Sequence, residues 1–494
     1  MSSTDITDAS TSKLGLRSVV LALAAIGVVL YGTGARAEIP PTTIAEDTRD
    51  EADADRRARL DAEDGSLSAK EPTAPAPGDT EPPFRSTRRP SPAKTMRPAE
   101  SAGKPFDFIN ETLTREWAAF RAGLTRLGIA PTTAYTAQFM GNPSGGQNRG
   151  FTYAGTLEIL IAWDLRALGG PPGLSVNVGA SWSSGTDLSS EFIGNVFTVQ
   201  SAFTGAGRVN LQQVFLQQQL FDGALSLAAG RLAPGNTFAT LPVFNNYLNG
   251  AINAVPGSLG INDPPFVASP PGVEWGAQAI YRVTPALQLA AGVYNTNPFA
   301  AAGQDHGINF SFQQGNRGLL TVAQVDYLLN QARGDAGWPG QYTIGGFYDS
   351  NTFSSLSDPG RTVSGDYGVY AMFQQMVHRD GGPGSPRGLT VWGELVISPN
   401  ASVSPMPYAL DDGLSYHGLI PRRGNDIASL GVIHGMFSRY IPGAAAETVI
   451  EANYQVTLTS WLSITPGVQY VIKPNGSGGI KDAVVIGAQL AVAF

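Results

Sequence analysis

The chain has 494 residues with no cysteine and four histidines, 15% of its residues are charged, and its formal net charge is −8. The lack of cysteine excludes disulfide bonds and thiolate zinc sites. Of the 390 residues after residue 104, only 42 are charged, whereas about one residue in four is charged in average soluble proteins. This part of the chain is acidic overall, so it lacks the basic surface that binding to nucleic acid requires.

The first 37 residues have the pattern of a secretory signal peptide. Lys13 and Arg17 precede an apolar run over residues 19–30, and residues 35–37 (Ala-Arg-Ala) match the small-x-small cleavage pattern. The run is too short for a membrane-spanning helix, which needs about 20 residues. We therefore predict that residues 1–37 are a signal peptide removed on export, in preference to a retained anchor.

Residues 38–104 mix proline, alanine and charged residues and contain few large apolar side chains. Such a segment cannot bury enough apolar surface to offset the entropy that a chain loses on folding. We expect a disordered arm whose first half is acidic and whose second half is basic. The arm is either a solvated tail or a segment that binds a partner through its basic half.

Residues 105–130 are expected to form a helical entry segment. Apolar residues recur there every three or four positions, which is the period of a helix. Asn110 is a suitable N-terminal cap, and Gly128 followed by Pro131 ends the pattern. The apolar positions are Ile109, Leu113, Trp117, Phe120, Leu124 and Leu127.

From residue 131 to the C-terminus, apolar and polar residues alternate in many short segments, for example residues 151–163, 447–458, 462–473 and 484–494. This period of two is typical of strands, and it fits either a soluble sandwich or a transmembrane barrel. A barrel has strands of about 9–11 residues, an apolar outer face, a polar lumen and aromatic girdles. The segments have this length and their polar faces carry Glu, Gln, Asn and Ser, so we predict an all-β, closed antiparallel transmembrane barrel over residues 131–494. Aromatic residues lie near the strand ends at Trp163, Trp182, Trp275, Tyr294 and Tyr470.

The last segment, residues 484–494, also alternates up to its final residue, Phe494. A terminal strand that does not fray needs a partner. We expect this strand to close the barrel onto the first one, with Phe494 facing lipid at the rim.

Several motifs, in this order along residues 115–494, resemble the carbohydrate-selective porin (OprB-type) family of bacterial outer membranes. They are Trp117-x-x-x-Arg121 followed by Leu127, Gly128 and Ile129; Gly141, Asn142, Gly145 and Gly146; the segments at 151–173 and 211–232; Arg423-x-x-Asp426 followed by Gly431; and the segment at 447–476. The resemblance implies a 16-stranded barrel with a short N-terminal helical segment that lets small sugars such as glucose diffuse passively into the periplasm. It also implies contact with outer-membrane lipid and lipopolysaccharide, and recognition of Phe494 as a signal by the outer-membrane assembly machinery.

Strand parity predicts which side chains line the sugar path. Carboxylates, amides and guanidinium groups can exchange hydrogen bonds with sugar hydroxyl groups, and weak binding at several positions favours passage. Arg422, Arg423 and Asp426 form the densest charge cluster in the motif region, and they are either a constriction-forming pair or an ion pair that fixes a loop. The side chains expected to face the lumen are Glu158, Glu274, Arg282, Trp392, Glu394, Glu447, Glu451 and Gln455.

Two other functions fit part of the pattern. A general small-solute porin would favour cations, because the lumen is acidic. A barrel hydrolase would need Ser429 or Ser438 beside His434, and only nearness in sequence supports it. Glu447 and Glu451 lie about 13 Å apart along a strand at ~3.3 Å per residue, too far for glycoside hydrolysis, and the histidines lack metal-ligand spacing.

We therefore expect that the protein is not an enzyme and that it binds no cofactor and no metal. The sequence leaves open which sugar is preferred, which loop constricts the pore, what the arm does and whether the barrels are monomers or trimers.

Overall fold

The computed structural model describes residues 120–202, 207, 209–266, 273–296, 306–308, 310, 318–331 and 335–493. The predicted signal peptide, the arm, the first part of the helical segment and Phe494 lie outside these residues. Residues 120–126 are helical, but the expected boundary at residue 130 is too late, because the first strand begins at Ile129. None of the helices in the described part of the chain is long and apolar enough to cross a membrane.

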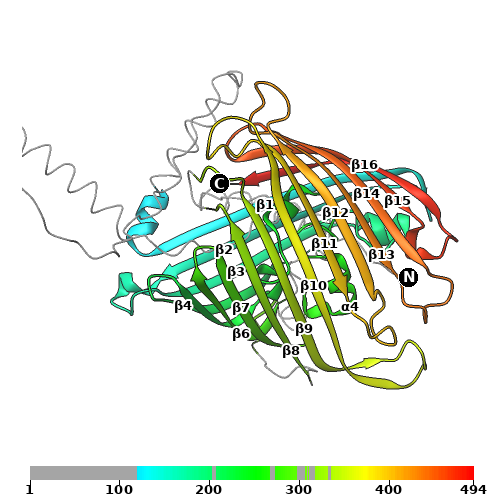
Figure 1. The fold of residues 1–494 in the computed structure, drawn as a ribbon, viewed down its shortest axis with the longest axis horizontal. Coiled ribbons are helices and arrows are strands. Elements are labelled where there is room, and N and C mark those ends of the chain that lie inside the picture. Colours follow the sequence, from blue (N-terminus) through cyan, green and yellow to red (C-terminus); the bar gives the residue numbers. More distant parts are fainter. Residues whose placement is uncertain are drawn as a thin grey trace, which may run out of the picture.

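Sixteen antiparallel strands form one closed barrel (Figure 1), which confirms the predicted fold class. Each strand pairs with its neighbours in sequence, and β16 pairs with β1, where Ala137 lies opposite Leu490. The strands are β1 (Ile129–Gly146), β2 (Phe151–Asp164), β3 (Leu174–Gly185), β4 (Val209–Leu220), β5 (Leu225–Leu232), β6 (Glu274–Thr284), β7 (Leu287–Asn295), β8 (Leu319–Leu329), β9 (Gly340–Ser354), β10 (Thr362–Arg379), β11 (Gly388–Ile397), β12 (Tyr408–His417), β13 (Ile427–Met436), β14 (Ala446–Thr457), β15 (Leu462–Ile472) and β16 (Lys481–Ala493).

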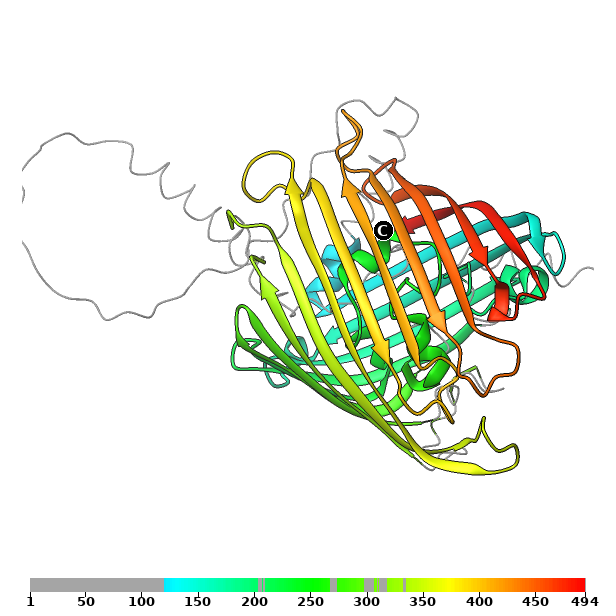
Figure 2. The same ribbon diagram turned by 45° about the vertical axis from the view of Figure 1, so that its right-hand side comes forward.

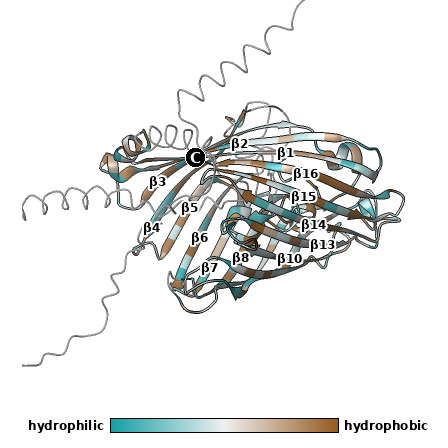
Figure 3. Cartoon of the chain, turned by 90° about the horizontal axis from the view of Figure 1, so that it is seen from above, coloured by the Kyte–Doolittle hydropathy of each residue, from teal (hydrophilic) through white to brown (hydrophobic). Residues whose placement is uncertain are grey.

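The period of two separates an outer face from a lumen face on each strand. On β14, Glu447, Val449 and Glu451 are buried while Ile450 is exposed. On β16, the exposed Ile486 belongs to the outward parity that the alternation predicted. Apolar and polar residues alternate along the strands in Figure 3. Exposed apolar side chains of this kind suit contact with lipid. The closed barrel also leaves no backbone group of a strand unpaired in the hydrocarbon region.

The antiparallel order places the start of β1 and the end of β16 at one end of the barrel, which we call the terminal end. The connections β4–β5, β6–β7 and β14–β15 are short turns at this end. The connections after β3, β5 and β7 are much longer and leave from the opposite end. In outer-membrane barrels the short turns face the periplasm.

Two of the long connections contain short helices, and the green helical turns between β5 and β6 lie inside the barrel ring in Figure 2. We call the two connections the β3–β4 insertion, described over residues 186–202, and the β5–β6 insertion, described over residues 233–266. Their helical turns are η2 (Ser189–Ile193) in the first, and η3 (Pro234–Asn236), η4 (Pro242–Asn246), α4 (Gly257–Asn262) and η5 (Pro264–Phe266) in the second. The remaining turns are η1 (Leu165–Leu168) and η7 (Pro474–Gly476).

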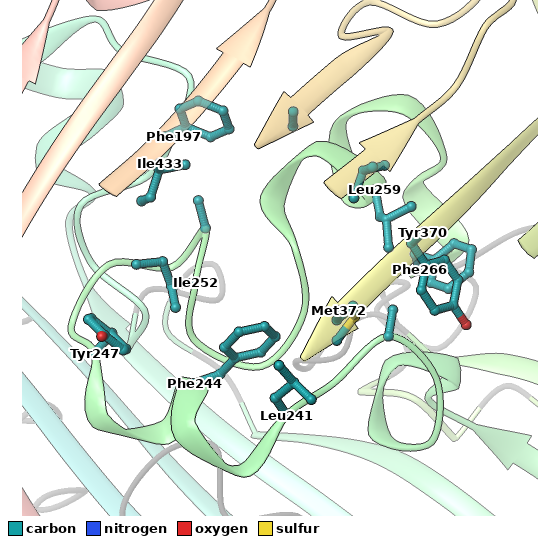
Figure 4. Close-up of a cluster of buried hydrophobic side chains, with 14 of the residues drawn as sticks. Phe197, Leu241, Phe244, Tyr247, Ile252, Leu259, Phe266, Tyr370, Met372 and Ile433 are labelled. Atoms are coloured by element: carbon teal, nitrogen blue, oxygen red, sulfur yellow. The ribbon is translucent and has the colours of Figure 1, made fainter. Parts of the chain in front are cut away.

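The insertions bury an apolar cluster inside the barrel (Figure 4). The expectation of a polar lumen is therefore incomplete for the part of the wall that the insertions cover, because apolar side chains lie there beside the polar ones. Full burial of one such side chain contributes about 1.5–3 kcal/mol relative to exposure, so this packing favours the insertions inside the barrel. The labelled members are Phe197, Leu241, Phe244, Tyr247, Ile252, Leu259 and Phe266 from the insertions and Tyr370, Met372 and Ile433 from the wall.

Candidate constriction site in the barrel lumen

The β5–β6 insertion crosses the lumen and is hydrogen bonded to strands that are far apart in the barrel. Several of these bonds join an insertion peptide group to a lumen-facing side chain of the wall. The crossing narrows the lumen. The bonds are Ala239 N to Gln324 Oε1 (2.9 Å, β8), Val243 N to Gln374 Oε1 (3.0 Å, β10), Leu248 N to Glu451 Oε1 (2.7 Å, β14) and Gln138 Nε2 (β1) to Leu248 O (3.1 Å).

Glu451 holds the middle of this insertion. Its Oε1 accepts the N–H of Leu248 at 2.7 Å, and its Oε2 accepts the N–H of Asn249 at 2.8 Å. Asn453, two residues further along β14, donates to Oε1 at 2.6 Å. The Glu451 side chain is fully buried. Both carboxylate oxygens are therefore used by neighbouring groups, and neither faces an open path.

Glu447 holds the β3–β4 insertion in the same way. Its carboxylate accepts the N–H of Val196 at 3.0 Å and that of Phe197 at 2.7 Å. A third N–H, from Asn475 in η7, donates at 2.6 Å. Glu447 is also fully buried. The two glutamates that parity predicted for the sugar path are thus covered by the insertions they bind.

Trp392 on β11 is covered too. Its indole Nε1 donates to the Tyr247 hydroxyl at 2.7 Å, and the two rings meet edge to face with centroids 5.4 Å apart. The Tyr247 hydroxyl also lies 3.1 Å from Leu414 O and 3.0 Å from Leu430 O. Phe244 also packs edge to face against Trp392, with ring centroids 5.3 Å apart. Trp392 is on the lumen face as predicted, and there it supports the β5–β6 insertion.

Glu394 and Glu274 are buried wall residues as well, at 4% and 1% exposure. Glu394 lies opposite Asp411 of β12 in register, so two carboxylates are adjacent. Asp411 accepts the backbone N–H of His434, a wall residue, at 3.0 Å. The Glu394 and Asp411 side chains are hydrogen bonded to each other. These groups belong to the covered wall.

The end of α4 brings a third carboxyl group against the wall. Asp263 is fully buried near Asp349 of β9 and Asp366 of β10. Burial, and then the charges of those two carboxylates, raise the pKa of Asp263 well above its usual range. The wall partners are themselves bonded, since Asn351 N donates to Asp349 and Ser404 Oγ to Asp366, each at 2.7 Å. The protonated form of Asp263 is the one that suits this site.

Three of the eight predicted lumen residues keep contact with solvent. Arg282 on β6 is exposed, and Glu158 on β2 and Gln455 on β14 are partly exposed. All three have the parity of the lumen face, because Arg282 alternates with the outward Tyr281 and Gln455 with the outward Tyr454. These residues can meet a solute, whereas the other five are covered.

Arg422, Arg423 and Asp426 lie in the turn between β12 and β13 at the terminal end. Arg423 Nε and Nη2 bind the two carboxylate oxygens of Asp426 at 2.7 and 2.8 Å. Asp426 also accepts the hydroxyl of Tyr454 at 2.8 Å and the N–H of Thr457 at 3.0 Å. The hydrogen bond to Asp426 raises the pKa of Arg423 above its usual value. This geometry is that of an ion pair that fixes a turn, and it lies away from the insertions.

The serine and histidine of the hydrolase alternative are separated. Ser429 Oγ bonds to Ser415 Oγ at 2.9 Å, while His434 Nδ1 bonds to Thr448 Oγ1 at 2.8 Å. Ser429 and His434 have opposite parity on β13, so they face opposite sides of the wall. Ser438 donates to the carbonyl of Ala401. Among the described residues, no group of three or more His, Asp or Glu side chains could hold a metal ion.

Sequence reasoning missed the glutamines that anchor the insertions. Gln138 accepts the N–H of Ala202 at 2.9 Å and donates to Gln489 at 2.9 Å, and Gln469 donates to Val199 O at 2.8 Å. Like the glutamates, they lie on the lumen face. The available signal was the run of inward amides on strands that lie far apart in sequence.

The chain is similar over most of its length to known porins. A family model described as "Carbohydrate-selective porin, OprB family" matches residues 148–494. Porin B of Pseudomonas aeruginosa is 24% identical over 441 residues, which cover 80% of this chain and 94% of that protein. The putative porin QuiX of Acinetobacter baylyi is 22% identical over 419 residues, covering 77% and 93%. The high-pH structure of Pseudomonas putida OprB superposes with a TM-score of 0.70 at 22% identity and covers 77% of this chain and 97% of that one. The barrel fold is therefore shared.

Proposed function

Because this chain belongs to the carbohydrate-selective porin family, we propose that it is a passive diffusion channel for monosaccharides of the glucose type. Membership makes the chain an outer-membrane carbohydrate porin. The proposal adds the size of the sugar and the residues that it meets. It also includes the expectation that the chain catalyses no reaction.

The observation that carries this proposal is the β5–β6 insertion, which is bound across the lumen from β8 to β1. A channel narrowed in this way admits small solutes in preference to large ones. We infer that the solute then passes the polar side chains that stay accessible, Glu158, Arg282 and Gln455. Carboxylate, guanidinium and amide groups can each exchange hydrogen bonds with sugar hydroxyls, and several weak contacts favour passage over retention.

Swelling of liposomes that contain the purified protein tests the proposal. Glucose is compared with a neutral solute of similar size that lacks the ring hydroxyls, and with arginine. We expect glucose to enter faster than both. Equal rates for the two neutral solutes would contradict sugar selectivity and leave a general sieve.

A cation-favouring general porin is the second candidate. It is supported by the covered carboxylates Glu394, Glu447 and Glu451, since in the described lumen wall they have no cationic side chain as an ion-pair partner. Under a KCl gradient this candidate predicts a reversal potential close to that of potassium, whereas a sugar channel needs no such bias. The two candidates are separated by measuring reversal potential and glucose swelling on the same preparation.

The partners follow from the membrane location. We propose that the outer face of the barrel contacts lipid and lipopolysaccharide, and that the assembly machinery recognises the C-terminal segment with Phe494. The turn cluster of Arg422, Arg423 and Asp426 would then face the periplasm with the other short connections. Monomer and trimer are both compatible with this arrangement.

A further inference from the structure

We propose that Glu447 and Glu451 are positioning residues that set the width of the channel, each by clamping one insertion to β14. This inference rests on the proposed function, because it concerns the same constriction. The two side chains are on one strand and on one face, four residues apart. A single strand therefore fixes the place of both insertions relative to each other.

The clamps have the chemistry of a carboxylate bound to consecutive peptide groups. Leu248 and Asn249 donate their N–H groups to Glu451, and Val196 and Phe197 donate theirs to Glu447. Successive N–H groups that converge on one point form an anion-binding concavity. Bonds to an ionised acceptor are shorter and roughly twice as strong as neutral ones. Each insertion thus supplies a site that is complementary to a negative charge on the wall.

Burial makes these bonds specific to the glutamates. Both side chains are fully buried, so water cannot replace a carboxylate oxygen that is removed. Val449, which lies between them on the same face, is also fully buried and belongs to the apolar cluster. The apolar cluster holds the insertions inside the barrel but does not fix their exact position. The hydrogen bonds to Glu447 and Glu451 fix which peptide groups of the insertions lie against the wall.

Replacement of Glu451 by glutamine tests its clamp. Glutamine has the same shape, but its amide nitrogen is a donor and would face a peptide N–H, so one of the two bonds is lost. In Glu451→Gln we expect the insertion to leave its position around Leu248. The single-channel conductance should then rise at least about twofold with added current noise, and glucose should block the current less.

Two companion variants distinguish positioning from folding. Glu451→Asp keeps the charge and both oxygens, so it should recover part of the wild-type conductance. Asp411→Asn is the matched control, because Asp411 is a buried wall carboxylate that bonds to wall groups, the N–H of His434 and the Glu394 carboxyl. It should keep wild-type conductance. The shift in gel mobility on heating reports in each case that a folded barrel is present.

A folded Glu451→Gln barrel with wild-type conductance and wild-type glucose block would overturn the proposal. An equal rise in Asp411→Asn would overturn it too, because any buried carboxylate would then have the same effect. If Glu451→Gln fails to fold, Glu447→Leu gives the test on the other insertion, because leucine lacks the oxygen that Val196 N and Phe197 N bind. The outcome is distinguishable from failure of the proposed function, since a channel without sugar preference would still change its conductance when a clamp is released.

Discussion

Strands β14 and β6 both carry charged side chains on their lumen faces, but they differ in what lies over those faces. On β14, Glu447 and Glu451 are fully buried and bind insertion peptide groups. On β6, Arg282 is exposed to solvent. The same parity therefore produces an anchor on one strand and an accessible side chain on the other. The difference lies in the insertions, which the strand pattern does not describe.

The largest effect is expected where the covered wall is packed most tightly. Trp392→Ala should lower the free energy of unfolding by about 3–5 kcal/mol, the usual cost of removing a buried large aromatic side chain. It also leaves the Tyr247 hydroxyl without its indole donor. Urea unfolding in lipid vesicles measures the change.

Leu395→Ala on the outer face of the same strand is the control for Trp392→Ala. Its side chain is 40% exposed, so the loss should be clearly smaller. Similar losses for the two variants would contradict the tight packing of the insertion on β11.

At the end of α4 a substitution is expected to raise the free energy of unfolding, in contrast to Trp392→Ala. The folded state favours protonated Asp263, because its pKa is raised by burial and by Asp349 and Asp366. Its contribution to stability is therefore fully present below the unfolded pKa, about 3.9, and is lost as the pH rises through the folded value. Asp263→Asn stays neutral, so it should be more stable than wild type at pH 8 and equal to it at low pH.

Urea midpoints of wild type and Asp263→Asn at pH 4 and pH 8 measure this difference. A variant that is less stable than wild type at pH 8 would show that an ionised Asp263 has a favourable partner, which would contradict the neutral assignment.

Substitution of the exposed lumen residue on β6 should change sugar transport and leave the free energy of unfolding unchanged. Arg282→Ala removes one exposed hydrogen-bond donor, and such a bond contributes about 0.5–1.5 kcal/mol. Glucose binding in the channel should therefore weaken by about two- to tenfold, as measured by glucose block of the current. Arg439→Ala, which removes an exposed arginine that lies 4.9 Å over the Tyr440 ring in the β13–β14 connection, is the control with unchanged block. An unchanged glucose block in Arg282→Ala would show that Arg282 does not contact the sugar in the channel.

The smallest effect on transport is expected in the turn. Arg423→Ala breaks an ion pair in which the arginine side chain is 40% exposed and the Asp426 side chain is 2% exposed. Asp426 keeps the bonds from Tyr454 and Thr457, so the loss of stability should lie between the about 0.2–1 kcal/mol of exposed pairs and the about 3–5 kcal/mol of breaking a buried pair. The single-channel conductance should stay at the wild-type value. A changed conductance would show that Arg422, Arg423 and Asp426 belong to the constriction.

The strand pattern was sufficient to predict the barrel, its closure and the lumen face of β14, because outward positions must be apolar in lipid and parity then fixes the rest. Glu451 was correctly placed on the lumen face, yet its role was not predictable. A carboxylate that binds peptide N–H groups leaves no mark on the sequence of the segment it binds, since every residue except proline supplies that donor.

The β5–β6 insertion did leave a compositional signal. Phe238, Phe244, Leu259 and Phe266 are large apolar residues in a connection that has no strand period, and all four are fully buried. A connection that runs over a surface has no reason to carry them. Where it folds was still not predictable, because its anchors, such as Gln138 and Gln324, are spread over the whole barrel.

The most direct test of the account is the single-channel conductance of a variant in which residues 242–250 are replaced by a Gly-Ser linker of equal length, recorded with and without glucose. We predict a folded barrel with a much larger conductance than wild type and no glucose block. Wild-type conductance and wild-type block in that variant would contradict the claim that the β5–β6 insertion narrows the channel.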